Sequence, residues 1–154
     1  MGAKNEAGEK LIFVDSNIWC YYFDKRLPEH QSVREPIRQI LMSSQEIVCN
    51  TIVVMEIAHY LVRHFREQDA RSKIEHFIHL SNMRILDFDA KAMSESLGIL
   101  LNYNYTHGLG GRDSTILASM NLHNIKTLMT HDDVFKRLSD KTHCNIIDPV
   151  ERNP

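Results

Sequence analysis

The sequence lacks the features that mark several specialised classes of protein. It has three cysteines, four prolines and six glycines in 154 residues, and no apolar run approaches the length of a membrane span. It also has no internal repeat, low-complexity tract or Pro/Gly-rich linker. The net charge of −2 argues against a general nucleic-acid coat, because such proteins use Lys and Arg to displace counterions from phosphates. A hydrophobic fraction of 43% and a charged fraction of 25% are those of an ordinary globular domain.

The cysteines and the first residues bear on the compartment. Cys20, Cys49 and Cys144 are widely spaced, have apolar or aromatic neighbours and form no CxxC or Cys-His pair. We expect them to be reduced core thiols, which suits a cytoplasmic protein. The first ten residues are polar and lack the apolar stretch of a signal peptide or anchor. We therefore expect a flexible lead over 1–10 and a single domain over 11–150.

Short apolar segments alternate with segments of helical spacing along this domain. The expected strands are 11–14, 47–49, 84–86, 126–129 and 145–147. The expected helices are 33–42, 52–65, 71–80, 90–101, 114–122 and 134–138, and a polar, Gly-rich loop is expected over 102–112. Strands that alternate with helices imply crossover connections. The pattern therefore predicts a three-layer α/β domain with a central parallel sheet covered on both faces.

Four acidic residues stand beside apolar sequence, where a carboxylate is costly. Asp15 and Asp132 follow expected strands, Glu56 lies within an apolar helix, and Asp113 begins another. Ligands of such sheets bind beyond the carboxyl ends of the strands, and these residues belong at that edge. Converging carboxylates repel one another unless a hard cation compensates, and Mg²⁺ or Mn²⁺ is the usual partner. The pattern predicts a divalent-metal site that would activate water to attack a phosphodiester.

Helix capping is the simpler explanation for most of these residues. Aspartate is a favoured N-cap, and Asp15, Asp113 and either Asp132 or Asp133 could each cap the helix that follows. Thr51 is well placed to cap the helix that contains Glu56. Capping explains each site tolerably when taken alone. It does not explain why Glu56 joins the same edge.

Several polar neighbours have two interpretations as well. Asn17 could hold a carboxylate in place or be a turn residue. Arg112 could pair with phosphate, although solvation is the more common state of an exposed charge. Ser114 could steady a carboxylate or start a helix, and Thr130 could join the turn before Asp132.

This order of residues resembles the PIN-domain family of metal-dependent ribonucleases, and especially the VapC-like toxins of prokaryotic toxin-antitoxin systems. The resemblance covers roughly residues 11 to 148. The motifs that carry it are Asp15-Ser16-Asn17 after the first strand, Glu56 in an apolar helix, Asp113 with Ile116 and Ala118 following, and Thr130-x-Asp132-x-x-Phe135 after the fourth strand.

The resemblance implies a three-layer α/β/α fold with strand order 3-2-1-4-5. It implies an acidic pocket formed by Asp15, Glu56, Asp113 and Asp132, with Asp132 preferred over Asp133 because the Thr-x-Asp-x-x-Phe spacing matches the family pattern. It also implies endonucleolytic cleavage of RNA through Mg²⁺ or Mn²⁺, leaving a 5′-phosphate and a 3′-hydroxyl. Members of the family often form homodimers, and the toxins are held inactive by an antitoxin whose peptide lies in the active-site groove.

Contact with RNA requires local positive charge. Candidates for it are Arg34, Arg38, Arg63, Arg66, Arg71 and Lys73, although interspersed acidic residues also fit solvated helix faces. The nine histidines are interpreted as surface or partly buried residues, because no third ligand stands near the His76/His79 pair. The alternative function is a catalytically inactive PIN-like module that binds RNA or protein. A phosphatase is disfavoured, because Asn17 occupies the second position of the expected Asp-x-Asp.

Overall fold

The computed structural model describes residues 10–150, so the expected flexible lead lies outside the described residues apart from Lys10. Five strands and seven helices occur in this range. They are β1 (Leu11–Val14), α2 (Ser16–Phe23), α3 (His30–Leu41), β2 (Glu46–Asn50), α4 (Thr51–His64), α5 (Glu67–Ile78), β3 (Met83–Leu86), α6 (Ala90–His107), α7 (Gly111–Leu122), β4 (Thr127–Met129), α8 (Asp133–Thr142) and β5 (Asn145–Ile147).

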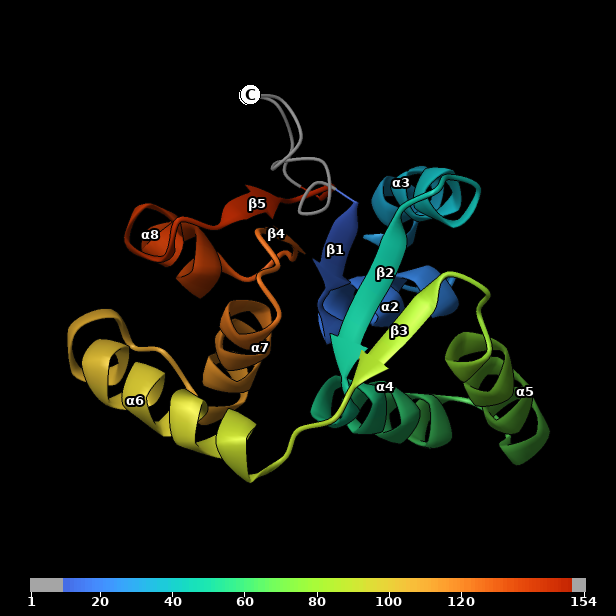
Figure 1. Cartoon of the computed structure of the whole chain (residues 1–154). Coiled ribbons are helices and arrows are strands. Elements are labelled where there is room, and N and C mark those ends of the chain that lie inside the picture. Colours follow the sequence, from blue (N-terminus) through green and yellow to red (C-terminus); the bar gives the residue numbers. More distant parts are fainter. Residues whose placement is uncertain (1–9, 151–154) are drawn as a thin grey trace.

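The five strands form one parallel sheet in the order β3-β2-β1-β4-β5, which confirms the predicted topology. The chain winds outward from β1 through β2 to β3, then crosses to the other side of β1 for β4 and β5. Right-handed crossovers in opposite directions put α2 to α5 on one face of the sheet and α6 to α8 on the other. Figure 1 shows these two groups on either side of the strands. The switch point lies between β1 and β4, at the carboxyl ends of both.

The core explains why the central strands read as continuous apolar runs. Both faces of β1 and β2 are covered, and the side chains of Ile12–Val14 and Ile47–Cys49 are buried. On the face covered by α2, the ring of Trp19 is fully buried and lies 4.8 Å from that of Phe77, centroid to centroid. This contact fixes α2 against α5, and α2 carries the residues that follow Asp15.

Helix boundaries differ from the predicted ones at several places. The expected loop over 102–112 is mostly helix, because α6 continues to His107 and ends at Gly108, whose φ of +71° is a left-handed conformation that favours glycine. Only residues 108–110 connect α6 to α7. The start of α5 lies at Glu67, earlier than predicted, and acidic residues in its first turn suit the positive end of the helix.

Two further expectations concern the cysteines, expected to be reduced core thiols, and the absence of a membrane span. Cys49 is buried, whereas Cys20 and Cys144 are only partly so, and all three are free. Within residues 10–150, no helix combines the length and the apolar character needed to cross a membrane.

Candidate active site

Asp15 is the most buried acidic residue of the predicted site. It follows β1 directly, and its side chain is 2% exposed with both oxygens engaged. Oδ1 accepts a hydrogen bond from the backbone N–H of Ser16 at 2.6 Å, so Asp15 does cap α2. Oδ2 accepts from the hydroxyl of Thr130 at 2.8 Å. Capping and membership of the acidic cluster are therefore compatible at this residue.

Thr130 links two of the predicted site residues. Its hydroxyl donates to Asp15 and accepts from the backbone N–H of Asp132 at 3.1 Å. The side chain of Thr130 is completely buried. A hydroxyl is both donor and acceptor, and this property lets one residue join the end of β1 to the turn after β4. The sequence placed Thr130 in the turn and in the Thr-x-Asp-x-x-Phe motif, but it did not indicate the contact with Asp15.

The neighbouring aspartates Asp132 and Asp133 have different surroundings. Asp132 is half-buried and caps α8 through Oδ1, which accepts from the backbone N–H of Val134 at 3.0 Å. Asp133 is exposed, with 77% of its side chain accessible, and lies 3.5 Å from the Nζ atom of Lys136. The negative charge of Asp132, in contrast to that of Asp133, raises the pKa of both Asp15 and Asp113. The geometry therefore favours Asp132 for the fourth position.

Glu56 and Asp113 meet across Arg112. The Nε atom of Arg112 lies 3.1 Å from Oε1 of Glu56 and 3.9 Å from Oδ1 of Asp113. Arg112 is exposed, as expected for a solvated charge, but it is also an intramolecular counterion. Capping by Asp113 is wrong, since Gly110 is the N-cap and Asp113 lies in the first turn of α7. There it benefits from the positive end of the helix dipole.

Ser114 and Asn17, two polar neighbours of the acidic residues, differ in whether their side chains are hydrogen-bonded. The hydroxyl of Ser114 contacts Ser96 at 2.7 Å and the carbonyl of Gly111 at 2.6 Å, so Ser114 bridges α6 and α7 rather than steadying a carboxylate. The Oδ1 atom of Asn17 is buried without a hydrogen-bond partner among the described residues. The same is true of Oε2 of Glu56 and Oδ1 of Asp113. These three oxygens are buried acceptors that lack donors.

Asn50, which sequence analysis overlooked, holds the two helices of the site together. Its Oδ1 accepts from the backbone N–H of Val53 at 2.8 Å, so Asn50 rather than Thr51 caps α4. Its Nδ2 donates to the carbonyl of Thr115 at 3.3 Å and to the hydroxyl of Ser119 at 3.1 Å, both on α7. A signal was present, because Asn is as good a cap as Asp and directly precedes the helix.

The electrostatics of the site indicate a shortage of positive charge. Burial raises the pKa of Asp15 and of Glu56, and it raises the pKa of Asp113 to about 6 with added repulsion from Asp132 and Asp15. Arg112 lowers the pKa of all three but does not cancel the increase. Each carboxylate is thus penalised when charged, and a cation would remove the penalty.

The carboxylates share one edge of the sheet but do not form a closed set of ligands. Among residues 10–150, no three His, Cys, Asp or Glu side chains lie close enough together to hold a metal ion. The His76/His79 pair therefore has no third ligand beside it within this range. The guanidinium of Arg112 lies between Glu56 and Asp113. The donor set nevertheless fits a hard divalent cation, because carboxylate and amide oxygens are its preferred ligands and three of these oxygens lack partners.

A groove leads away from the acidic residues along α2. It has a volume of about 600 Å³ and begins at Ser16, Glu56 and Arg112. At its far end Asp24 binds the guanidinium of Arg26 at 2.8 and 2.9 Å and accepts from the hydroxyl of Tyr60 at 2.7 Å. The groove is open to solvent and has the size of a site for an extended ligand.

The chain also resembles known proteins. A family model described as the PIN domain matches residues 12–141. Similar solved structures include VapC20 of Mycobacterium tuberculosis, described as a toxin that cleaves the sarcin-ricin loop, with 16% identity over 82% of this chain and 93% of that chain and a TM-score of 0.70. VapBC2 of Rickettsia felis, bound to a DNA fragment from their promoter, has 24% identity over 90% of this chain and 98% of that chain and a TM-score of 0.67.

A toxin-antitoxin complex from Klebsiella pneumoniae is similar as well, with 18% identity over 92% of this chain and 99% of that chain and a TM-score of 0.65. A comparison with curated proteins gives no match. At these identities the solved structures share the fold, whereas the family model identifies the sequence itself over most of its length. The sheet order, the acidic edge and this match agree, and the chain belongs to the PIN-domain family.

Proposed function

We propose that the protein is a divalent-metal-dependent endoribonuclease and the toxin of a toxin-antitoxin pair. One observation carries the proposal. Glu56 and Asp113, each with a raised pKa and a buried oxygen that accepts no hydrogen bond from the described residues, face the edge at which Asp15 and Asp132 are joined through Thr130. A cation would offset the cost of charging buried carboxylates in this state. The similarity to solved toxin-antitoxin complexes supports an antitoxin partner and the toxin role.

The four acidic residues would hold Mg²⁺ or Mn²⁺, with Asp15 and Asp113 as the principal ligands. When bound, such a cation polarises a phosphoryl oxygen and lowers the pKa of a bound water. The hydroxyl of Thr130 keeps the carboxylate of Asp15 in one orientation. Arg112, released from Glu56 once a cation neutralises that carboxylate, would bind a phosphate oxygen of the RNA beside the scissile bond.

The proposal is tested by incubating structured RNA with the purified protein in Mn²⁺, Mg²⁺ or EDTA, beside Asp15→Asn purified in the same way. We expect cleavage with either metal, none with EDTA and none with Asp15→Asn. Products with 5′-phosphate and 3′-hydroxyl ends would match the expected chemistry. Cleavage that persists in Asp15→Asn would identify a contaminant. Absence of cleavage together with absence of metal binding by calorimetry would favour the inactive binding module.

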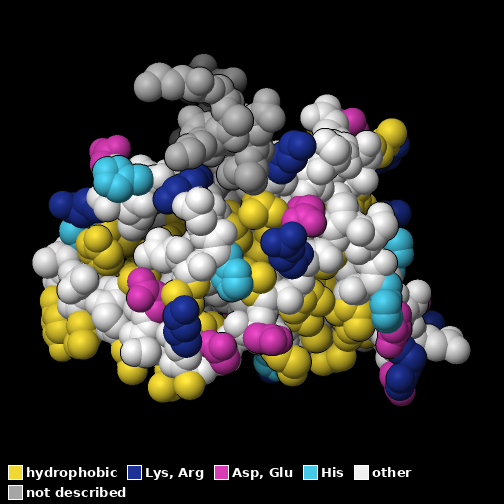
Figure 2. All heavy atoms as spheres, viewed as in Figure 1, with side chains coloured by type: hydrophobic (Ala, Val, Ile, Leu, Met, Phe, Trp, Pro, Cys, Tyr) yellow, Lys and Arg dark blue, Asp and Glu magenta, His cyan; other side chains and the backbone are white. Residues whose placement is uncertain are grey.

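We also propose that the protein forms a homodimer, and exposed apolar side chains support this. They are Met93, Leu97, Leu101 and Tyr105, at four-residue intervals on α6, with Met55 and Val62 on α4. Figure 2 shows hydrophobic side chains gathered along the lower left edge, over α6. Residues four apart share one face of a helix, so the α6 residues form a stripe. A contiguous apolar stripe on a soluble domain is typical of an interface between subunits.

Replacing both Leu97 and Leu101 with Glu is expected to convert the dimer to a monomer. Two like charges brought into an apolar interface would weaken association by more than about 100-fold. Sedimentation equilibrium over a range of protein concentrations measures the change. The control is Asn102→Glu, which adds a charge at a neighbouring exposed position outside the stripe. A wild-type protein that stays monomeric at all concentrations would contradict the dimer.

The free state of all three thiols agrees with a reducing compartment, and we propose a cytoplasmic location on this ground. The protein would then encounter both its RNA substrate and its antitoxin in the cytoplasm.

A further inference from the structure

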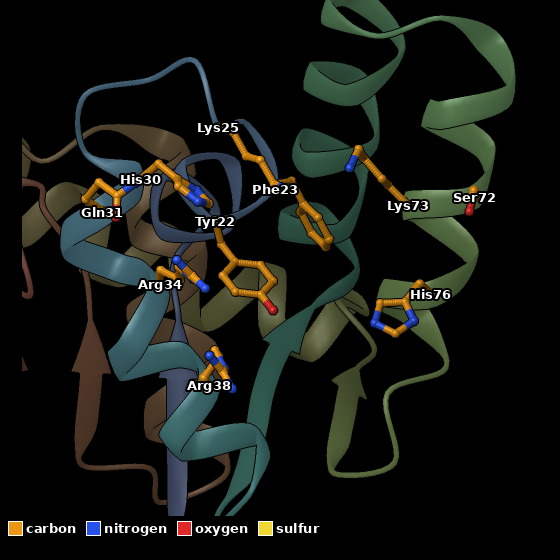
Figure 3. Close-up of a pocket in the computed structure, with 10 residues that line it drawn as sticks. All are labelled: Tyr22, Phe23, Lys25, His30, Gln31, Arg34, Arg38, Ser72, Lys73 and His76. Atoms are coloured by element: carbon orange, nitrogen blue, oxygen red, sulfur yellow. The ribbon is translucent and has the colours of Figure 1, made fainter.

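A second cavity lies between α3 and α5, beyond the carboxyl-terminal end of α2, and is separate from the groove beside the acidic residues. It has a volume of about 620 Å³. Figure 3 shows Arg34 and Arg38 on one wall, and Lys73 and His76 on the other, with the ring of Tyr22 between them. We call this cavity the basic cleft. Lys25, in the connection after α2, stands at its rim.

The basic cleft concentrates positive charge in a chain whose net charge is −2. Four Lys and Arg side chains line it, and no Asp or Glu does so. Among residues 10–150, none of these four forms an ion pair. Lys73 instead lies over the rings of Phe65 and Phe23, at 5.1 and 6.0 Å from their centroids. The cleft is therefore a cation cluster without an internal counterion.

The arrangement of these side chains suits a chain of phosphates. Arg34 and Arg38 are four residues apart, so their guanidinium groups project from the same face of α3 in successive turns. Lys73 and His76 are three residues apart and share a face of α5 in the same way. An aromatic ring between rows of cations is the combination that binds single-stranded nucleic acid, through phosphate contacts and base stacking.

An RNA substrate of the acidic site needs a positively charged surface elsewhere on the protein. Carboxylates repel RNA, and of the two arginines in the groove beside them Arg26 is bound to Asp24, so Arg112 alone is proposed to reach a phosphate there. Further cations that hold the substrate must then lie farther along its path. The groove runs along α2 from Ser16 to Asp24, and Tyr22 and Phe23 line the basic cleft, so residues at the carboxyl-terminal end of α2 line both cavities. The eight residues of α2 span about 12 Å from the acidic residues to this end.

We propose that the basic cleft binds backbone phosphates of single-stranded RNA several nucleotides away from the bond that is cleaved. This inference rests on the proposed function and adds a substrate class to it: single-stranded RNA long enough to extend from the acidic residues along α2 to the space between α3 and α5. Arg34, Arg38 and Lys73 provide the phosphate contacts, and Tyr22 provides a surface on which a base stacks.

The test compares wild type with the triple variant Arg34→Ala, Arg38→Ala, Lys73→Ala. Binding of a fluorescent single-stranded RNA of about twelve nucleotides is followed by anisotropy in EDTA, where cleavage is not expected. We expect affinity to fall on the order of 100-fold, because three charged contacts are lost. The slope of log affinity against log salt should decrease by about 2, at about 0.7 for each phosphate contact.

A matched control loses the same charge elsewhere. In Lys91→Ala, Lys126→Ala, Lys141→Ala, three exposed lysines outside every ion pair formed by the described residues are removed. Its affinity should stay within about threefold of wild type, since only the distant electrostatic field changes. Thermal melts of both triple variants establish that they remain folded. Equal RNA affinity of the two triple variants, or no binding by wild type, would overturn the proposal.

Cleavage assays separate this proposal from the proposed function. With Mn²⁺, the cleft variant should cleave a dinucleotide as fast as wild type but lose at least about tenfold in kcat/KM on the longer RNA. Loss on both substrates would indicate damage to the acidic site and would count against a remote cleft. An absence of cleavage by wild type would reject the nuclease without affecting the binding result. Binding of poly-glutamate to wild type and to the cleft variant is measured in the same way. If the cleft variant loses poly-glutamate binding but keeps RNA binding, the proposal is overturned and the cleft is assigned to an acidic protein segment.

Discussion

Replacing Asp113 with Asn is expected to lower metal-dependent RNA cleavage by about 1,000-fold or more and, at the same time, to make the metal-free protein more stable. Activity falls because a principal metal ligand loses its charge. Stability rises because the substitution removes a carboxylate that burial and the charges of Asp132 and Asp15 disfavour. Loss of stability in exchange for function is common at binding sites. The two effects therefore have one cause.

The stability effect depends on pH in a defined direction. Burial and the neighbouring carboxylates raise the pKa of Asp113 from 3.8 to about 6 in the folded protein, so folding favours the protonated carboxyl. Its contribution to stability is present below about pH 4 and is lost as the pH rises through about 6. We expect Asp113→Asn to match wild type near pH 4. Near pH 7.5 it should exceed wild type by about 1 kcal/mol, after allowance for screening by solvent.

Urea unfolding at both pH values in EDTA, paired with cleavage assays in Mn²⁺, measures the two effects. The control is Asp133→Asn, which alters an exposed carboxylate beside Lys136 and should leave cleavage unchanged. Added Mn²⁺ should stabilise wild type far more than Asp113→Asn, because only wild type retains the full ligand set. An Asp113→Asn protein less stable than wild type at pH 7.5 would mean that Asp113 has a structural role that outweighs its charge.

The strands and their edge were predictable from sequence for a simple physical reason. A strand buried on both faces must be apolar throughout, so Leu11–Val14 was located to the residue. A carboxylate at the end of an apolar strand is unusual enough to be informative, which is why Asp15, directly after β1, and Asp132, three residues after β4, stood out. The order 3-2-1-4-5 came from the family resemblance, because alternation alone fits several strand orders.

Helix ends and long-range contacts were less accessible. The segment after Leu101 is polar and reads as a loop, yet it remains helical until Gly108 permits a left-handed residue. The pairing of Arg112 with Glu56 joins residues from α7 and α4, and no spacing along the chain reveals it. The basic cleft likewise joins α3 to α5. Three of its members, Arg34, Arg38 and Lys73, appeared in the sequence as candidates for RNA contact, but their separation from acidic neighbours became visible only in three dimensions.

Substitution of Asn50, which lies outside the acidic set, should have a large effect on stability. It is completely buried, and its one side chain caps α4 and bonds twice to α7. Asn50→Ala removes the cap and leaves buried polar groups of Thr115 and Ser119 without this partner. We expect a loss of about 3 kcal/mol, about 1 from the cap and the rest from the two broken bonds.

Asn50→Ser separates the two roles of this side chain. A serine hydroxyl can still accept from the backbone N–H of Val53, so the cap is kept, but it cannot replace the amide that donates to α7. Urea unfolding should give a loss of about 1 to 2 kcal/mol, between wild type and Asn50→Ala. Ser119→Ala is the matched control, because it removes one of the two α7 partners and spares α4.

Cleavage assays on Asn50→Ser then report on the position of Glu56 relative to Asp113. Glu56 is carried by α4 and Asp113 by α7, and Asn50 is the side chain that ties these helices together. If the tie sets the separation of the two carboxylates, kcat/KM in Mn²⁺ should fall about 10- to 100-fold in Asn50→Ser, as it does when residues that orient metal ligands are lost. Full activity in a variant that has lost stability would show that packing of α4 and α7 positions the site without this bridge.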